Sequence, residues 1–159
     1  MLTCTKIWDD LTFTHRQYSH QSKCSRIHGH NWKLELTFAC KETDNYGFVI
    51  DYSALEYIND WIRKNLDHTN IFAEQDPALS VLHELESDLF QIVVVQNSST
   101  EGIAEFIHDS LNPMVLSQTK ERAWMNKVKL WEFSKTGATY IHSAFRNAEC
   151  PPAYSAKAT

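Results

Sequence analysis

The chain has 159 residues, the size of one ordinary domain, and 43% of them are hydrophobic against 22% charged. This composition excludes a disordered, collagen-like or membrane-spanning chain, and no apolar run approaches the length that crosses a bilayer. The formal charge of -5 argues against a broad nucleic-acid surface. The N-terminus lacks the basic start and apolar core of a signal peptide. The sequence therefore predicts a cytoplasmic protein that binds neither nucleic acid nor membrane.

Alternating apolar residues predict two strands in the first forty positions. In residues 5–15 the apolar side chains fall on odd positions, with an interruption at Asp9 that indicates a bulge. Residues 28–38 alternate on even positions, and the polar, aperiodic segment 16–27 indicates a loop between the two strands. The returning strand of a hairpin is predicted at residues 47–51.

A serine followed three residues later by glutamate opens each of two predicted helices, first at Ser53 and Glu56 and then at Ser98 and Glu101. Apolar residues repeat at helical spacing after both signatures. Pro113, preceded by asparagine, is expected to end the second helix.

Two further strands are predicted at residues 127–133 and 138–143. Between the helices, segment 69–97 is expected to hold a short helix within residues 78–90 and a strand at 92–95. Strands grouped with helices in this order indicate an α+β fold, with an antiparallel sheet and both helices on one face.

The predicted single domain spans residues 1–145. Residues 146–159 lack an apolar period and contain two adjacent prolines, so they are expected to form a flexible tail.

Three histidines are candidate metal ligands. His28 and His30 flank Gly29, and on a strand their side chains point the same way, with Cα atoms about 6.6 Å apart. His15 ends the apolar face of the first strand, so pairing of the strands would bring three imidazoles together. Three neutral nitrogens and a vacant position are the ligand set of catalytic zinc. The alternative is that the pair forms only a polar loop end.

Other candidate residues carry acid, base or anchoring groups. Cys24 is a fourth zinc ligand, an inert thiol, or a base whose pKa is lowered by neighbouring cations and a metal. Asp67 lies next to His68, a pairing that can tune an acid or base group. Glu132 shares the parity of a predicted core face, where a carboxylate needs a partner: a salt bridge, or the paired N–H donors of a ligand.

These residues occur in an order that resembles the 6-pyruvoyltetrahydropterin synthase superfamily over positions 13–140. The motifs that carry the resemblance are His15, Cys24-x-x-x-His28-Gly29-His30, Gly47-Phe48-Val49-Ile50-Asp51, Leu66-Asp67-His68, Ser99-Thr100-Glu101 with Ala104, and Glu132 with Tyr140. Three residues between the cysteine and the His-Gly-His motif resemble the branch that forms 6-carboxytetrahydropterin in 7-deazaguanine (queuosine and preQ0) biosynthesis.

The resemblance implies a tunnelling fold with four main antiparallel strands and two helices, in which subunits join their sheets into a homohexamer, a dimer of trimers. It implies a lyase that converts 7,8-dihydroneopterin triphosphate to 6-carboxy-5,6,7,8-tetrahydropterin, acetaldehyde and triphosphate at a site between subunits. Zn²⁺ would be held by His15, His28 and His30.

The resemblance also implies the remaining roles in the active site. Cys24 would be the base, Asp67 and His68 its proton relay, and Glu132 the pterin anchor and a member of the relay. Ser99 and Thr100 would contact the substrate.

Compared with compact members of the family, the segment 69–97 is longer, so it is expected to be an insertion that adds a helix and a strand. Two further departures from the family pattern bear on the substrate site. The family commonly has Asn-Pro-Thr where this chain has Asn97-Ser98-Ser99, and threonine where it has Phe133. The alternative functions are a pyruvoyl-forming or dihydroneopterin-cleaving relative, and a non-catalytic protein that binds zinc and a pterin.

Overall fold

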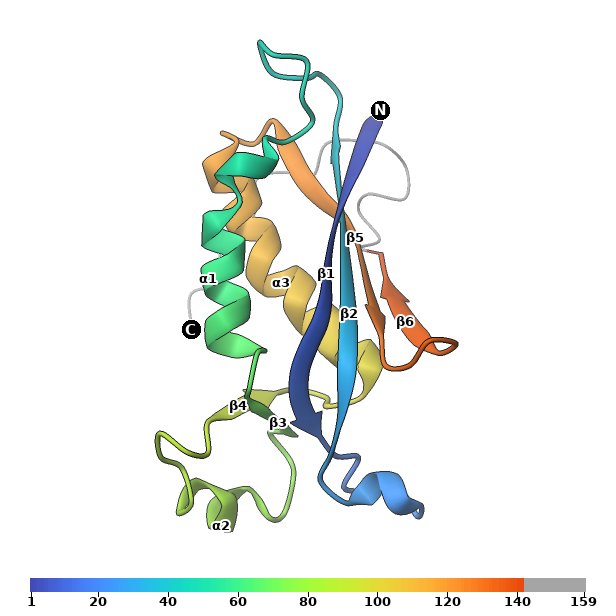
Figure 1. Ribbon diagram of the computed structural model, residues 1–159, viewed down its shortest axis with the longest axis vertical. Coiled ribbons are helices and arrows are strands. Elements are labelled where there is room, and N and C mark those ends of the chain that lie inside the picture. The colour runs from blue at the N-terminus through green and yellow to red at the C-terminus, as the bar shows by residue number, and fades with distance from the viewer. Residues whose placement is uncertain (142–159) are drawn as a thin grey trace.

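A six-stranded sheet runs through the computed structural model of this protein, which describes residues 1–141. Its strands are β1 (Leu2–His15), β2 (His28–Cys40), β3 (Asn70–Ala73), β4 (Ile92–Val95), β5 (Ala123–Trp131) and β6 (Gly137–Tyr140). The α-helices are α1 (Glu56–Asn65), α2 (Leu79–His83) and α3 (Thr100–Gln118), with short 3-10 turns at Lys23–Ser25 and Tyr52–Ala54. Helices α1 and α3 cover one face of the sheet (Figure 1). The predicted α+β class is therefore confirmed.

The sheet is mixed, in the order β4-β3-β1-β2-β5-β6. Four strands, β1, β2, β5 and β6, pair antiparallel, but β3 and β4 are parallel to β1 and to each other. The purely antiparallel description was thus wrong for the segment 69–97, which adds two strands and α2. Parallel neighbours need a crossover between them, and the segment containing α2 supplies it.

The register of β1 against β2 positions the histidines. The expected bulge is present, because the pairing shifts between Trp8 and Leu11, and Asp10 has a φ of 59°. Beyond the bulge, Phe13 lies opposite His30 and His15 lies opposite His28. On this side of the bulge the odd residues of β1 therefore share one face with the even residues of β2, and the histidines lie at its end. Before the bulge, the even residues of β1 lie opposite the even residues of β2.

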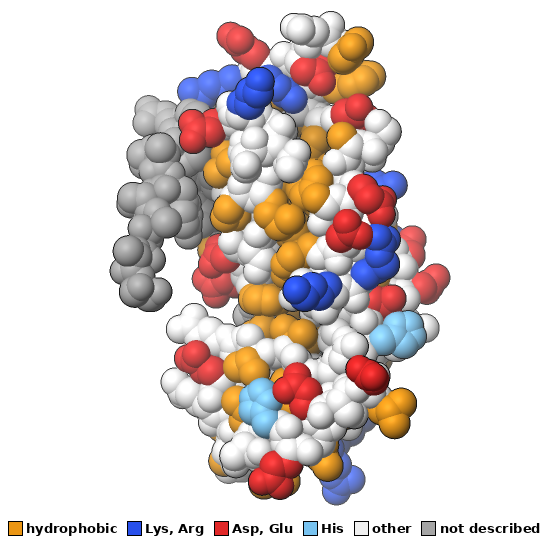
Figure 2. Space-filling model, turned by 90° about the vertical axis from the view of Figure 1, so that its left-hand side faces the viewer, with side chains coloured by type: hydrophobic (Ala, Val, Ile, Leu, Met, Phe, Trp, Pro, Cys, Tyr) orange, Lys and Arg blue, Asp and Glu red, His pale blue; other side chains and the backbone are white. Residues whose placement is uncertain are grey.

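The core lies between this face and the helices. Trp32 is fully buried and stacks on Phe13 with 4.4 Å between ring centroids. Ile58 of α1 and Ile107 of α3 are also fully buried in the same cluster. On the outer side of the helical layer, a strip of hydrophobic side chains runs between charged ones (Figure 2). The predicted core role of Trp32 is confirmed.

Residues 47–51 do not form the predicted strand. The Asp44 carboxylate accepts hydrogen bonds from the N–H groups of Tyr46 and Phe48, which turns the chain. The Arg122 guanidinium donates to the carbonyl oxygens of Phe48 and Val49. Side chains satisfy backbone groups that a strand partner would otherwise bind, so the apolar run stays irregular.

Both predicted helix starts are displaced. Asp51, rather than Ser53, caps a 3-10 turn, and α1 begins only at Glu56. Ser99, rather than Ser98, caps α3 by accepting the N–H of Gly102 at 3.1 Å.

Helix α3 also continues through Pro113, to Gln118. Proline has no N–H group, so the carbonyl one turn earlier in α3 loses its hydrogen-bond donor. Because Pro113 is exposed, water can reach that carbonyl instead. Next to it, the Asn112 side chain accepts the N–H of Met125 at 2.9 Å and holds the helix on β5.

Strand β5 begins earlier than predicted and ends at Trp131, and β6 covers the start of the predicted last strand. The proposed flexible tail, 146–159, lies outside the described residues, as does the end of the predicted domain. Within residues 1–141, no helix combines the length and apolar character needed to cross a membrane.

Candidate metal centre

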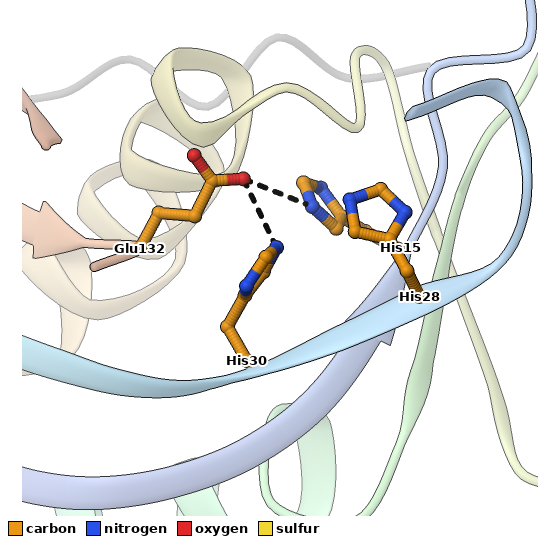
Figure 3. Close-up of side chains that lie close together, drawn as sticks. All are labelled: His15, His28, His30 and Glu132. Carbon is orange, nitrogen blue, oxygen red and sulfur yellow. Dashed lines mark ion pairs between the residues drawn. The ribbon is translucent and has the colours of Figure 1, made fainter. Parts of the chain in front are cut away.

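Four side chains meet at the end of the sheet. His15 comes from the end of β1, His28 and His30 from the start of β2, and Glu132 from the residue after β5 (Figure 3). One ligand atom from each lies within 4.8 Å of the corresponding atoms of the other three. The Glu132 Oε1 atom is 3.3 Å from His15 Nε2 and 3.2 Å from His30 Nε2. The structure thus brings together the three histidines as their strand parity predicted.

Backbone carbonyls fix two of the imidazoles. His15 Nδ1 lies 2.9 Å from the Ser98 carbonyl oxygen, and His28 Nδ1 lies 2.7 Å from that of Arg26. A carbonyl can only accept, so each Nδ1 carries the proton and each Nε2 keeps its lone pair in the neutral ring. Proteins commonly orient a histidine ligand in this way, by a carbonyl oxygen that accepts from the ring nitrogen facing away from the metal.

Burial favours the neutral form of two of the rings, His15 and His30. Loss of solvent lowers the pKa of His15, although the hydrogen bond to the Ser98 carbonyl opposes this change. Burial also lowers the pKa of His30, against the attraction of the Glu132 carboxylate. Since metals bind neutral imidazole, the lowered pKa values favour ligation at neutral pH.

The residues fit a metal ion. The Nε2 atoms of His15 and His30 are buried, and neither makes a hydrogen bond of normal geometry within the described chain. Buried nitrogens without such bonds are costly unless something occupies their lone pairs. Donors around a tetrahedral zinc are about 3.4 Å apart at zinc–nitrogen distances of about 2.1 Å. Small side-chain movements bring this cluster to that spacing.

Comparison with known protein families gives a match to most of this chain. The sequence profile of one family, described as 6-pyruvoyl tetrahydropterin synthase, matches residues 5–143 of this chain. The chain belongs to the 6-pyruvoyl tetrahydropterin synthase family. It is 30% identical over 135 residues to the 6-carboxy-5,6,7,8-tetrahydropterin synthase of Rickettsia bellii, an alignment that covers 83% of this chain and 94% of the relative. The same identity and coverage are found with the Rickettsia felis enzyme of that name. The predicted membership of this enzyme family is confirmed.

Solved structures share the fold of this family member. An uncharacterized protein of Wolinella succinogenes superposes with a TM-score of 0.73 at 19% identity, covering 88% of this chain and 97% of the other. The 6-pyruvoyl tetrahydropterin synthase of Caenorhabditis elegans superposes with a TM-score of 0.62 at 20% identity, covering 89% and 96%.

Two of the family motifs lie apart from the histidine cluster. Cys24 is a half-buried free thiol in the 3-10 turn of the β1–β2 loop, outside the group of atoms within 4.8 Å. Asp67 Oδ1 and His68 Nδ1 are 3.0 Å apart, so this adjacent pair does make contact. The His68 side chain is 81% exposed, and its backbone N–H donates to the Thr12 carbonyl. Among the described residues, no hydrogen bond or ion pair joins this pair to the cluster.

The predicted substrate contacts Ser99 and Thr100 form the start of α3. The Ser99 hydroxyl is used in the helix cap. Ser98, immediately before them, is fully buried and holds His15 through its carbonyl. The start of α3 is therefore adjacent to the metal centre.

Sequence reasoning missed the oxygen atoms that orient the histidines. The Ser98 and Arg26 acceptors are backbone carbonyls, which every residue type carries, so no sequence signal marks them. The position of Glu132 beside His15 and His30 was also missed, although its parity in the strand indicated an inward direction. Phe133 follows it with its ring centroid 4.5 Å from that of His30.

Proposed function

We propose that this family member is a zinc-dependent carbon–carbon lyase. Its substrates are 7,8-dihydroneopterin triphosphate and one water molecule, and its products are 6-carboxy-5,6,7,8-tetrahydropterin, acetaldehyde and triphosphate. The observation that carries the proposal is the histidine cluster, with two Nδ1 atoms anchored on carbonyls and the Nε2 atoms available for a metal. The names of the Rickettsia relatives support the choice of product.

In this proposal His15, His28 and His30 hold the zinc ion. When bound, zinc acts as a Lewis acid that stabilises negative charge developing on a substrate hydroxyl oxygen. Trp32 and Phe13 are buried and stacked next to the histidines, so they support the ligands with closely packed side chains. A rigid support preserves the ligand geometry during turnover.

Cys24 serves as the base that removes a proton from the substrate side chain, and Asp67 with His68 relays protons. The exposure of His68 and its separation from the cluster favour a site shared between subunits, in which this pair faces the metal centre of a neighbouring copy. A homohexamer, a dimer of trimers, is the assembly proposed to complete the site.

Glu132 anchors the pterin by accepting two of its N–H groups, and it also takes part in the proton relay. Its carboxylate is 25% exposed and therefore accessible from solvent. A cavity of about 440 Å³ borders Glu132 and His30, together with Phe133 and the Thr12–Thr14 segment. This space supports binding of a pterin-sized ring beside the histidines. Ser99 and Thr100 contact the substrate from the start of α3.

The proposed product feeds 7-deazaguanine (queuosine and preQ0) biosynthesis in the cytoplasm. The test is incubation of zinc-loaded protein with 7,8-dihydroneopterin triphosphate, with products identified by mass spectrometry. Wild type is compared with Cys24→Ala and with the control Cys4→Ala near the opposite end of β1.

Formation of 6-carboxytetrahydropterin and acetaldehyde by wild type and Cys4→Ala, but not by Cys24→Ala, is the expected result. A pyruvoyl product would instead assign the chain to the alternative reaction. Zinc and pterin binding without turnover would contradict the enzymatic proposal and indicate a binding protein.

A further inference from the structure

The segment between β3 and β4, which lies within the predicted insertion 69–97, is attached to the end of β1 by an ion pair. The Arg16 Nε atom lies 2.9 Å from Asp76 Oδ2. The Asp76 side chain is fully buried and that of Arg16 is 21% exposed. Arg16 directly follows the metal ligand His15, and Asp76 lies in the loop between β3 and α2. Figure 1 places this loop region beside the end of β1.

Asp76 also organises its own loop. Its Oδ1 atom accepts the N–H of Ala78 at 2.9 Å, and its backbone carbonyl accepts the N–H of Leu79. One oxygen thus fixes the turn into α2, while the other faces Arg16. The loop geometry therefore determines where the carboxylate holds the Arg16 side chain.

Ser98 connects the same two residues of β1 to the start of α3. Its hydroxyl donates to the Arg16 carbonyl at 2.6 Å, and its own carbonyl accepts from His15 Nδ1 at 2.9 Å. Ser98 is fully buried, so water does not replace either bond. A displacement of Arg16 therefore moves the Ser98 hydroxyl that is bonded to its carbonyl. The Ser98 carbonyl, which orients His15, moves with it.

We propose that Asp76 and Ser98 are positioning residues for the metal ligand His15, and that the inserted segment acts on the metal centre through Arg16. The chain of contacts runs from the Asp76 carboxylate to the Arg16 side chain, from the Arg16 carbonyl to the Ser98 hydroxyl, and from the Ser98 carbonyl to His15. The inference rests on the histidine cluster being a metal site, as the proposed function does. It gives the insertion a role in metal binding.

The test measures zinc affinity by competition with a chromophoric chelator, without substrate. Asp76→Asn removes the charge that faces Arg16 and keeps an oxygen for the Ala78 N–H. Ser98→Ala removes the hydroxyl and keeps the backbone carbonyl. The matched controls are Asp88→Asn and Ser80→Ala, at exposed positions of the same insertion.

We expect Asp76→Asn and Ser98→Ala each to weaken zinc binding by about 10- to 100-fold, the usual effect of losing an outer-shell partner. Their Co²⁺-substituted forms should show altered d–d absorption, because His15 no longer takes its wild-type orientation. The two controls should match wild type. A purely structural role would lower the melting temperature of the metal-free protein and leave affinity and spectrum unchanged.

Folded variants that bind zinc within twofold of wild type, with the wild-type Co²⁺ spectrum, would overturn the inference. If Asp76→Asn does not fold, the pair Arg16→Gln/Asp76→Asn, which removes both charges, takes its place with the same expected loss. Weaker zinc binding in the variants together with a catalytically inactive wild type would support the inference and refute the proposed function. A wild type that binds no zinc would refute both.

Discussion

Replacing Gly102 with alanine should disturb the metal centre from within α3. A Cβ atom at this position would lie 2.2 Å from the carbonyl oxygen of Asn97 and 2.9 Å from its carbonyl carbon. A Cβ atom essentially never lies closer than 3.0 Å to another non-bonded heavy atom, so the carbonyl oxygen of Asn97 has to move by roughly 0.8 Å or more. Ser98 is the next residue, and its carbonyl is the acceptor for His15 Nδ1.

The expected cost follows from two opposing effects. Overpacking costs about 1–3 kcal/mol, and the better helix propensity of alanine offsets up to about 1 kcal/mol. A net loss of about 1–2 kcal/mol lowers the melting temperature by about 2–8 °C in a chain of this size. Displacement of the Ser98 carbonyl should also weaken zinc binding by about tenfold or more.

The matched control is Gly29→Ala, between the ligands His28 and His30. There a Cβ atom would have its nearest neighbours at 3.4 Å, the Phe13 carbonyl oxygen and Thr14 Cγ2, which is tolerable contact. Thermal unfolding and chelator competition on both variants test the argument. Wild-type stability and affinity in Gly102→Ala, or equal damage in Gly29→Ala, would refute it.

Three further predictions concern the metal, pH and one buried hydroxyl. Chelation of bound zinc should remove about 2.7 kcal/mol of stability when the free metal had been at a hundred times its Kd, and an unchanged melting temperature would contradict metal binding. Burial lowers the pKa of His15 and His30, so the unfolded chain binds protons that the folded metal-free protein does not. Its melting temperature should therefore fall as the pH drops from 7.5 to 5.5, through the unfolded histidine value of about 6.5, whereas a constant value would exclude this linkage. The Tyr57 hydroxyl is buried without a hydrogen-bond partner among the described residues, and burial raises its pKa to about 12. Tyr57→Phe should raise the melting temperature by a few degrees, because an unsatisfied hydroxyl costs about 1–3 kcal/mol; a decrease would reveal a partner.

Strand parity was enough to predict that the three histidines meet at one end of the sheet. His28 and His30 share the even face of β2, and His15 ends the odd face of β1, so antiparallel pairing leaves little freedom in where the rings meet. The inward direction of Glu132 follows from the same rule. The contact of Glu132 with the histidines could not be predicted in the same way, because this contact depends on β5 ending at Trp131.

Sequence patterns for strands and helix caps gave wrong predictions where groups distant in the sequence form hydrogen bonds with the residues concerned. Arg122 donates to the carbonyls of Phe48 and Val49, which lie 74 and 73 positions earlier in the chain, and these bonds take the place of the strand expected there. Ser98 has the spacing of a helix cap, yet its hydroxyl donates to Arg16, 82 positions earlier, and Ser99 caps α3 instead. The four-residue strand β3 is too short for an apolar period to show.

The sequence distances within the metal centre bear on when it can form during synthesis. All three histidines leave the ribosome within the first thirty residues, but Ser98 and Glu132 follow much later. β2 itself pairs with β5, which comes from the last third of the described chain. A nascent chain therefore exposes three imidazoles before it has the carbonyl that orients His15 or the carboxylate that faces the cluster. If the cluster binds a metal as proposed, stable loading would follow completion of the chain, because an ion bound earlier would be held only by ligands of undefined geometry.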